Sequence, residues 1–276
     1  MTVILSGFAD EISPDLDEQL ATLTGQSIAH LELRSAWSVS VADLSDADVG
    51  RVGSALSYAG IRVSAIGSPV GKIPVEAPIG PELDRLRRVA EIAGRLGTPI
   101  IRVFSFFIPA GQPPGRYRDQ VIDRMGALAT VAESHGVILA HENEKEIYGD
   151  LPQRCADLIE SVSSPALRAT FDAANFVQCG VRPQSDAYPL LRRHLIYVQI
   201  KDALAQTGEV VPAGEGDGEV RETLAALRDS GFEGYLSLEP HLAEAGRFGG
   251  FSGPAGFGRA VRALRALLAE LRIPWR

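Results

Sequence analysis

Short apolar runs alternate with longer amphipathic segments along the whole 276-residue chain, and this alternation restricts its fold more than any other sequence feature. The apolar runs predict β-strands at residues 2–7, 29–34, 61–66, 99–104, 137–142, 167–172, 195–201 and 235–239. Helical spacing predicts helices at residues 13–24, 43–59, 81–96, 117–134, 152–162, 186–193, 219–229 and 259–271. Gly60, Gly97 and Gly136 directly follow three of these helices, as is typical of helix C-termini.

Regular alternation of strands and helices implies parallel strands joined by helical crossovers. Eight such units without an obvious linker favour a single-domain α/β protein, a (β/α)8 TIM barrel that spans residues 1–276. The alternative is a doubly wound open sheet. It is disfavoured because no predicted strand is followed by a glycine-rich turn of the GxGxxG type. The glycine-rich segment 214–218 carries two acids, which makes it a poor phosphate site.

The composition of the chain indicates which partners and which cellular compartment to expect. A net charge of -8 and a pI near 5.2 argue against nucleic-acid binding, which depends on Lys and Arg side chains that neutralise phosphates. Cys155 and Cys179 form no CxxC motif and are too few for a disulfide framework, so we expect free thiols in a reducing compartment. With no visible signal peptide and no run long enough to span a bilayer, a cytoplasmic protein without membrane partners is expected.

Polar side chains lie at the ends of four consecutive predicted strands, from the fifth to the eighth. They are Glu142, Asp172, Gln199 and Glu239. In a parallel barrel the C-terminal ends of the strands face one mouth, where active sites lie, so these side chains are expected to converge. Strand parity directs Glu142 towards the barrel interior and its neighbour His141 towards the helices, which gives His141 a structural role.

Three converging carboxylates repel one another and hold a proton between them unless a cation is present. Together with the neutral Gln199 oxygen they form a plausible shell for a divalent metal, with positions left open for a substrate. A single acid at a strand end is more often a solvated loop residue or a helix cap. Four polar strand ends on successive strands favour the metal site.

Short motifs at the strand ends resemble those of a known family. They are Gly7-Phe8-Ala9-Asp10-Glu11-Ile12-Ser13, Glu32-Leu33-Arg34, Glu142-Asn143-Glu144, Phe171-Asp172 with Asn175, Ile200-Lys201-Asp202, and Ser237-Leu238-Glu239-Pro240-His241. In this order they resemble the xylose isomerase-like barrels, which comprise sugar isomerases and epimerases and a DNA-repair endonuclease branch. The resemblance implies metal ligands at Glu142, Asp172, Gln199 and Glu239. Relatives usually carry His at the position of Gln199, and a harder oxygen ligand shifts preference from zinc towards manganese or magnesium.

The resemblance also implies a reaction. Glu142 and Glu239 would act as acid and base on a sugar or keto-sugar, through an enediolate, in an isomerase or epimerase. The alternative is a lyase or dehydratase that acts on a 3-keto-sugar, keto-glycoside or inosose. From another class comes a non-catalytic sugar-binding barrel, which the Gln199 departure allows. The endonuclease branch is disfavoured by only five histidines and by the acidic balance of the chain.

The remaining site residues are implied less directly. Lys201 and His241 are candidate catalytic residues, whereas Arg34, Arg102 and Asn175 are candidate substrate contacts; ion-pair or packing roles stay open for these side chains. The glycine-rich segment 246–258, with Phe248, Phe251 and Phe257, predicts a mobile lid loop, with a turn or subunit contact as the alternative. The family habit implies a homo-oligomer. Glu215 and Asp217 near the expected mouth mildly disfavour a phosphorylated sugar.

Overall fold

The computed structural model describes residues 2–246 and 249–276 and contains one eight-stranded parallel sheet. Its strands, in spatial order, are β1 (Ile4–Gly7), β12 (Tyr235–Leu238), β9 (Leu195–Ile200), β8 (Leu167–Asp172), β7 (Ile138–Glu142), β6 (Ile100–Val103), β5 (Arg62–Gly67) and β2 (His30–Leu33). A parallel bridge between Phe8 and Glu32 links the β1 and β2 sides, so the sheet is a nearly closed barrel. The predicted TIM barrel is confirmed, and the open-sheet alternative is wrong.

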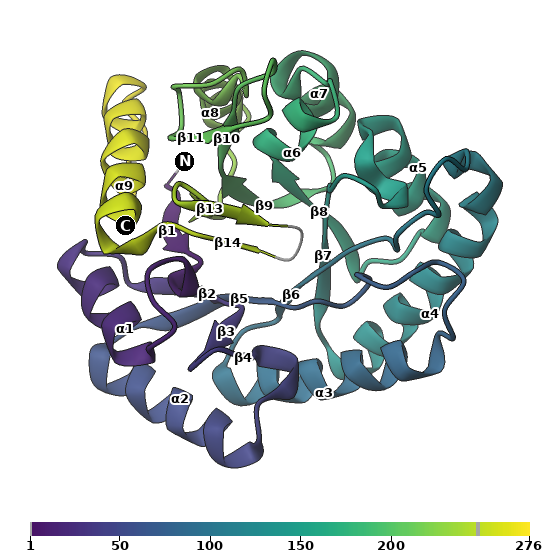
Figure 1. Cartoon of the computed structure of the whole chain (residues 1–276), viewed down its shortest axis with the longest axis horizontal. Helices are drawn as coiled ribbons and strands as arrows, with labels where there is room; N and C mark the ends of the chain where they lie inside the picture. Colours follow the sequence, from purple (N-terminus) through teal and green to yellow (C-terminus); the bar gives the residue numbers. More distant parts are fainter. Residues whose placement is uncertain (1, 247–248) are drawn as a thin grey trace.

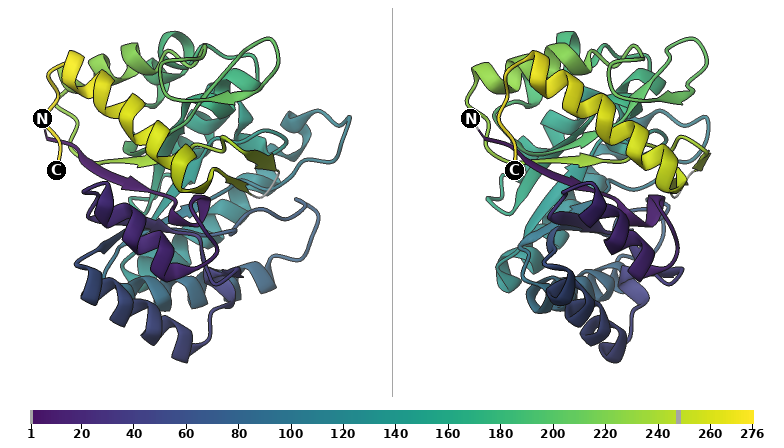
Figure 2. Two further views of the ribbon diagram at one scale, coloured as in Figure 1. Left: turned by 60° about the vertical axis from the view of Figure 1, so that its left-hand side comes forward. Right: turned by 90° about the vertical axis from the view of Figure 1, so that its left-hand side faces the viewer.

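The helices lie outside the strands, as Figures 1 and 2 show. They are α1 (Leu16–Gly25), α2 (Asp46–Ala59), α3 (Gly80–Leu96), α4 (Arg118–His135), α5 (Pro152–Val162), α6 (Ala173–Gln178), α7 (Tyr188–Leu191), α8 (Val220–Asp229) and α9 (Gly253–Glu270). The last helix lies beside the first, and Arg265 of α9 donates to the backbone oxygen of Gln26 after α1. None of the helices in the described residues is long and apolar enough to cross a membrane.

Local sequence explains most helix boundaries. The side chain of Asp15 accepts hydrogen bonds from two backbone N–H groups in the first turn of α1, as an N-cap residue does. Gly60, Gly97 and Gly136 close α2, α3 and α4 in the left-handed conformation, at φ of 68°, 76° and 66°. These three termini agree with the sequence-based expectation.

Apolar side chains fill the layer between barrel and helices, whereas the barrel interior is partly polar. Ser64 Oγ lies 2.6 Å from Ser6 Oγ and 2.8 Å from the Tyr197 hydroxyl, and all three side chains are buried. These hydroxyls satisfy one another inside the barrel. They form a hydrogen-bonded layer inside the barrel, below the C-terminal ends of the strands.

Three hairpins extend the loops at the C-terminal ends of the strands. They are β3 (Ser35–Ala36) with β4 (Val39–Ser40), β10 (Asp202–Ala203) with β11 (Val210–Val211), and β13 (Glu244–Gly246) with β14 (Gly249–Phe251). The sequence pattern did not predict them, because strands of two or three residues carry no periodicity.

The segment at residues 246–258, expected as a mobile lid loop, is not a loop in the part that the structure describes, and its role as a lid stays a prediction. This segment contributes to the β13–β14 hairpin and to α9, which begins at Gly253, six residues before the predicted start. Phe257 is fully buried in the core, and Phe251 is 36% exposed. Phe248 lies outside the described residues. The aromatic residues therefore do not share one lid surface.

Two smaller corrections concern the segment after β8. Asn175, expected in a loop, lies in the first turn of α6 because the Asp172 side chain accepts from its backbone N–H at 2.8 Å and caps the helix. The helix expected at residues 186–193 is a π-helix (Pro183–Ala187) followed by the short α7.

The glycine-rich segment 214–218 wraps around an internal carboxylate. Asp202 accepts hydrogen bonds from the backbone N–H groups of Ala203, Gly214, Gly216 and Gly218 at 2.8 to 3.1 Å. A Cβ atom at Gly216 or Gly218 would lie 2.5 Å from Asp202 Oδ1, which explains glycine at both positions. Asp202 fills the place of an external anion, in agreement with the low weight given to a phosphate site.

We expect Asp202→Ala to lower the free energy of unfolding in urea by about 3 kcal/mol or more, because several N–H groups lose their acceptor. Asp217→Ala is the matched control, since Asp217 accepts one exposed hydrogen bond, from Ala205 N at 2.7 Å. Its loss should cost less than about 1 kcal/mol. Equal losses in both variants would contradict this account of the segment.

Candidate active site at the barrel mouth

Three carboxylates meet at the C-terminal end of the barrel. Glu142 ends β7, Asp172 ends β8, and Glu239 directly follows β12; all three are buried. One oxygen of each lies within 4.8 Å of the others, which is close enough for one metal ion to bind all three. The structure thus brings together the three acids that strand parity placed at the mouth.

Gln199 lies beside this cluster on β9, in register with Asp172 on β8 and Ser237 on β12. Its Nε2 donates to Glu32 Oε1 at 3.4 Å, and Ser237 Oγ donates to Glu32 Oε2 at 2.8 Å. Gln199 Oε1 is buried and accepts no hydrogen bond from the described residues. A buried carbonyl oxygen without a donor, next to three carboxylates, fits the fourth position of an oxygen-rich metal site.

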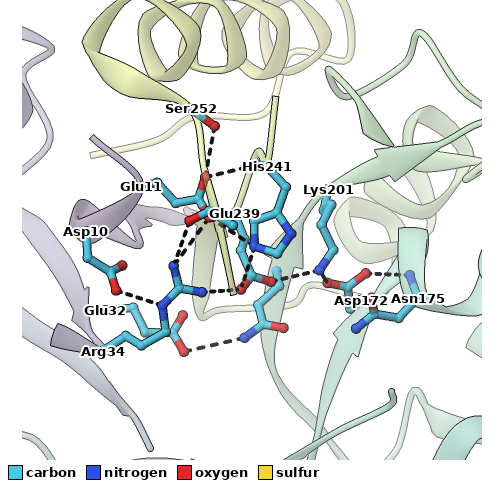
Figure 3. Close-up of polar contacts among 12 residues, drawn as sticks. Asp10, Glu11, Glu32, Arg34, Asp172, Asn175, Lys201, Glu239, His241 and Ser252 are labelled. Carbon is cyan, nitrogen blue, oxygen red and sulfur yellow. Dashed lines mark hydrogen bonds and ion pairs between the residues drawn. The ribbon is translucent and has the colours of Figure 1, made fainter. Parts of the chain in front are cut away.

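Lys201 supplies the positive charge between two of the acids. Its Nζ lies 2.9 Å from Asp172 Oδ2 and 2.9 Å from Glu239 Oε2. Burial opposes the ammonium form, but the two carboxylates hold the pKa of Lys201 well above its usual range. The lysine is therefore charged at neutral pH, and Figure 3 shows it between Asp172 and Glu239.

The three acids differ in their pKa shifts. Burial raises the pKa of Asp172 to about 7, with Lys201 opposing the shift, and burial also raises the pKa of Glu142. Burial acts in the same direction on Glu239, yet Lys201, His241 and Arg34 together hold its pKa well below the usual value. Protonation is therefore favoured at Glu142 and Asp172 over Glu239, in the direction that repulsion between converging acids predicts.

Two arginines face the mouth and contact the glutamates. Arg34 donates to Glu239 Oε1 at 3.0 Å and to Asp10 Oδ2 at 2.7 Å, whereas Arg102 donates to Glu142 Oε2 at 3.1 Å. Their guanidinium groups lie 4.8 and 5.2 Å from the centre of the Phe8 ring. Both arginines therefore lie beside the cluster, and each is tied to a candidate acid or base; their contact with a substrate stays a prediction.

His241 belongs to the site through a carboxylate that the sequence did not single out, Glu11. His241 Nε2 lies 2.9 Å from Glu11 Oε1 and 3.4 Å from Glu239 Oε1. Ser252 Oγ donates to Glu11 Oε2 at 2.8 Å, so Glu11 ties the segment after β14 to the mouth. Glu11 is buried at the end of the 3-10 helix Ala9–Glu11. In the sequence, Glu11 was visible only as part of the acidic Asp10–Glu11 pair that follows the first predicted strand.

Asn175, expected as a substrate contact, is hydrogen-bonded to two of the acids. Its Nδ2 donates to Glu142 Oε1 at 3.0 Å and to the backbone oxygen of Asn143 at 2.9 Å. Asn143 in turn donates to the Asp172 backbone oxygen and accepts from its N–H, both at 2.9 Å. The two asparagines therefore fix the ends of β7 and β8, and Asn143 is a site residue that the sequence analysis quoted but did not assign.

Other titratable groups lie outside the mouth. His141 is buried against Ser105 Oγ at 2.9 Å, and burial lowers its pKa to about 3, so it is a neutral structural residue as parity predicted. Burial raises the pKa of Cys179 to about 11 and that of Cys155 further. Both cysteines are free thiols.

Comparisons with known proteins agree with this geometry. A family described as "Xylose isomerase-like TIM barrel" matches residues 28–267. A 2-epi-5-epi-valiolone 7-phosphate 2-epimerase from an Actinoplanes species is 34% identical over 154 residues, 52% of this chain and 52% of that protein. The alpha subunit of a C-glycoside deglycosidase from Microbacterium trichothecenolyticum is 34% identical over 122 residues, 40% of this chain and 30% of that protein.

The matches to these two curated relatives span about half of their length or less. A solved structure described as a D-tagatose 3-epimerase-like protein superposes with a TM-score of 0.79 at 15% identity, and covers 99% of this chain and 98% of that one. At this identity the structural likeness supports the fold alone.

We expect Mn²⁺ to raise the melting temperature of the protein by about 5–10 °C at a concentration near 100 times its dissociation constant. Asp172→Asn should abolish most of this shift, because the site loses a charged ligand. Glu144→Gln removes a nearby carboxylate that lies outside the three-acid cluster and should keep the shift. A wild-type protein that Mn²⁺ does not stabilise would contradict the metal site.

Gln199 allows a second test, of metal preference. We expect Gln199→His to increase the affinity for Zn²⁺ relative to Mn²⁺ by about tenfold or more, because imidazole suits zinc better than an amide oxygen does. Gln199→Ala, the control, should weaken the binding of both metals and leave their ratio nearly unchanged. Competition titrations measure the ratio; an unchanged ratio in the histidine variant would remove Gln199 from the ligand set.

Proposed function

Because the chain belongs to the xylose isomerase-like TIM barrel family, as its motifs indicated, we propose that it is a metal-dependent isomerase or epimerase of a sugar or keto-sugar. One observation carries the proposal. Glu142 and Glu239 come from strands separated by β8 and β9, yet their carboxylates meet around one centre. Two carboxyl groups that approach a substrate carbon from different strands suit proton removal on one side and proton return on the other.

The metal would be held by Glu142, Asp172, Glu239 and Gln199 Oε1, an all-oxygen set that favours Mn²⁺ or Mg²⁺ over Zn²⁺. When bound, such an ion supplies Lewis acidity that lowers the pKa of a C–H bond next to a carbonyl. The identity of the metal is part of the proposal.

The side chains of this chain would move the proton. One glutamate takes the proton from the carbon beside the carbonyl, and the bonding pair moves into the carbonyl to give an enediolate. The other glutamate returns a proton to the opposite face, which inverts the centre. Its return to the neighbouring carbon, together with transfer of the hydroxyl proton from one enediolate oxygen to the other, interconverts ketose and aldose. Lys201 lies next to Glu239 and would stabilise negative charge that develops on the substrate oxygen.

Both carboxylate oxygens of each glutamate accept a hydrogen bond, which fixes the orientation of the side chain. Asn175 and Arg102 donate to the two oxygens of Glu142, and Arg34 and Lys201 donate to the two oxygens of Glu239. Fixed carboxylates need little reorganisation when the proton moves. This arrangement gives Arg34, Arg102 and Asn175 a positioning role beside any contact with substrate.

The curated relatives support the reaction class in part. One is named a 2-epi-5-epi-valiolone 7-phosphate 2-epimerase, and the other a C-glycoside deglycosidase subunit. The second name favours the alternative reaction, in which loss of a leaving group from the same enediolate makes the enzyme a lyase or dehydratase. A small carbohydrate substrate is common to both alternatives.

The test is proton exchange in D₂O with manganese present. We expect the wild-type enzyme to incorporate one solvent deuterium into a keto-sugar without other change in mass, and Glu142→Gln and Glu239→Gln to slow this by about 10²–10⁴-fold. Asp186→Asn, which removes an exposed carboxylate paired with Arg182, should stay within a few-fold of wild type. Loss of water or an aglycone would establish the lyase instead, and no exchange with any keto-sugar would contradict both.

A further inference from the structure

A pocket of about 320 Å³, lined in part by charged and hydroxyl side chains, opens next to the glutamates. It lies between the β3–β4 hairpin and the segment after β5, and its lining includes Asp10, Arg34, Lys72, Arg102 and three serines. The volume is at the lower end of the range for small-molecule sites, about 300–1,000 Å³, and suits a single sugar ring rather than an oligosaccharide. Arg34 and Arg102 also contact Glu239 and Glu142, so the pocket adjoins the proposed reaction centre.

The cations of this pocket are balanced by carboxylates. Arg34 pairs with Asp10 at 2.7 Å, and Lys72 pairs with Glu144 at 3.4 Å. Arg102 pairs with Glu142 at 3.1 Å. Each of the three cations therefore already has a carboxylate partner, which suits the binding of hydroxyl groups better than the binding of a dianion.

Asp10 offers an acceptor that no described residue uses. Its Oδ2 accepts from Arg34 Nε at 2.7 Å and from Ser35 Oγ at 2.9 Å, whereas its Oδ1 is buried and has no hydrogen-bond partner among the described residues. Figure 3 shows Asp10 with contacts to Arg34 through one oxygen only. Arg102 Nε is likewise buried, and no described residue accepts a hydrogen bond from it. Unpaired buried polar atoms are costly, so these two atoms point to a ligand.

A hydroxyl group can satisfy either atom, since it can donate a hydrogen bond to the Asp10 oxygen or accept one from the Arg102 nitrogen. A phosphate group is mostly a dianion at neutral pH, so it has no proton to donate to Asp10. Its negative charge would also be repelled by the Asp10 carboxylate at short range. We propose that this pocket binds the non-reacting part of the substrate as an uncharged polyol, and that Asp10 accepts a hydrogen bond from one of its hydroxyl groups. The inference rests on the proposed function, and it makes the substrate a free sugar or cyclitol rather than a phosphorylated one.

The experiment compares binding of D-fructose and D-fructose 1-phosphate, which can both form the same rings and differ in the phosphate on one terminal hydroxyl, by calorimetry on the manganese-loaded protein. We expect wild type to bind the free sugar about tenfold or more tightly, since a hydrogen bond to a charged group and like-charge repulsion each contribute at this scale. Asp10→Asn keeps the shape but removes the charge, and should reduce that preference about tenfold. Asp10→Ala should weaken binding of the free sugar itself.

Asp186→Asn is the matched control, because it removes the same charge from an exposed carboxylate that pairs with Arg182. It should keep the wild-type preference, because Asp186 does not line the pocket. Equal or tighter binding of the phosphate, an unchanged preference in Asp10→Asn, or binding of neither sugar would overturn the inference. If the enzyme catalyses deuterium exchange but binds the phosphorylated sugar more tightly, the proposed function stands and this inference fails. If sugar binding depends on Asp10 but no exchange occurs, the binding site stands and the proposed function fails.

Discussion

The ion pair of Lys201 with Asp172 and Glu239 is the interaction on which the mouth of the barrel depends. Three carboxylates buried within 4.8 Å of one another cannot all be ionised without nearby positive charge. Lys201 reaches two of them at 2.9 Å, and the arginines reach Glu142 and Glu239 from the opposite side. Removing one partner of such a buried set is strongly destabilising, because it leaves an uncompensated charge. The cations therefore make the close approach of the acids possible.

Rigid surroundings keep this charge arrangement in place. Asn143 bonds both backbone groups of Asp172, which ties the end of β8 to the segment after β7, while Asp202 holds the glycine-rich segment directly beyond Lys201. Glu11 performs the same task on the other side, because it accepts from the His241 backbone and from Ser252. Every acid of the cluster thus stands on a strand end that is itself fixed by buried hydrogen bonds, as a preorganised site requires.

The sequence predicted the barrel well because its strands and helices carry strong periodicity, and parity placed Glu142, Asp172 and Glu239 at one mouth. Glu11 and Asn143 escaped assignment, because their partners are contributed by segments that only the folded chain brings together; Glu11 meets Ser252, 241 residues away. The hairpin β13–β14 was missed because its glycines are typical of loops. Asn175 was placed in a loop, since a helix that begins with Asp172 as its cap is too short to show an apolar repeat.

Gln199 shows how the interior of the barrel can orient an amide side chain. An amide can present either its oxygen or its nitrogen to the carboxylates, and only the oxygen can serve a cation. Glu32, fixed by Ser237, accepts from Gln199 Nε2 inside the barrel, which leaves Oε1 as the atom without a partner among the described residues. Burial raises the pKa of Glu32 to about 8, so this neighbour adds little negative charge at neutral pH. The amide is therefore oriented by the barrel interior, and its carbonyl is the end available to the acids.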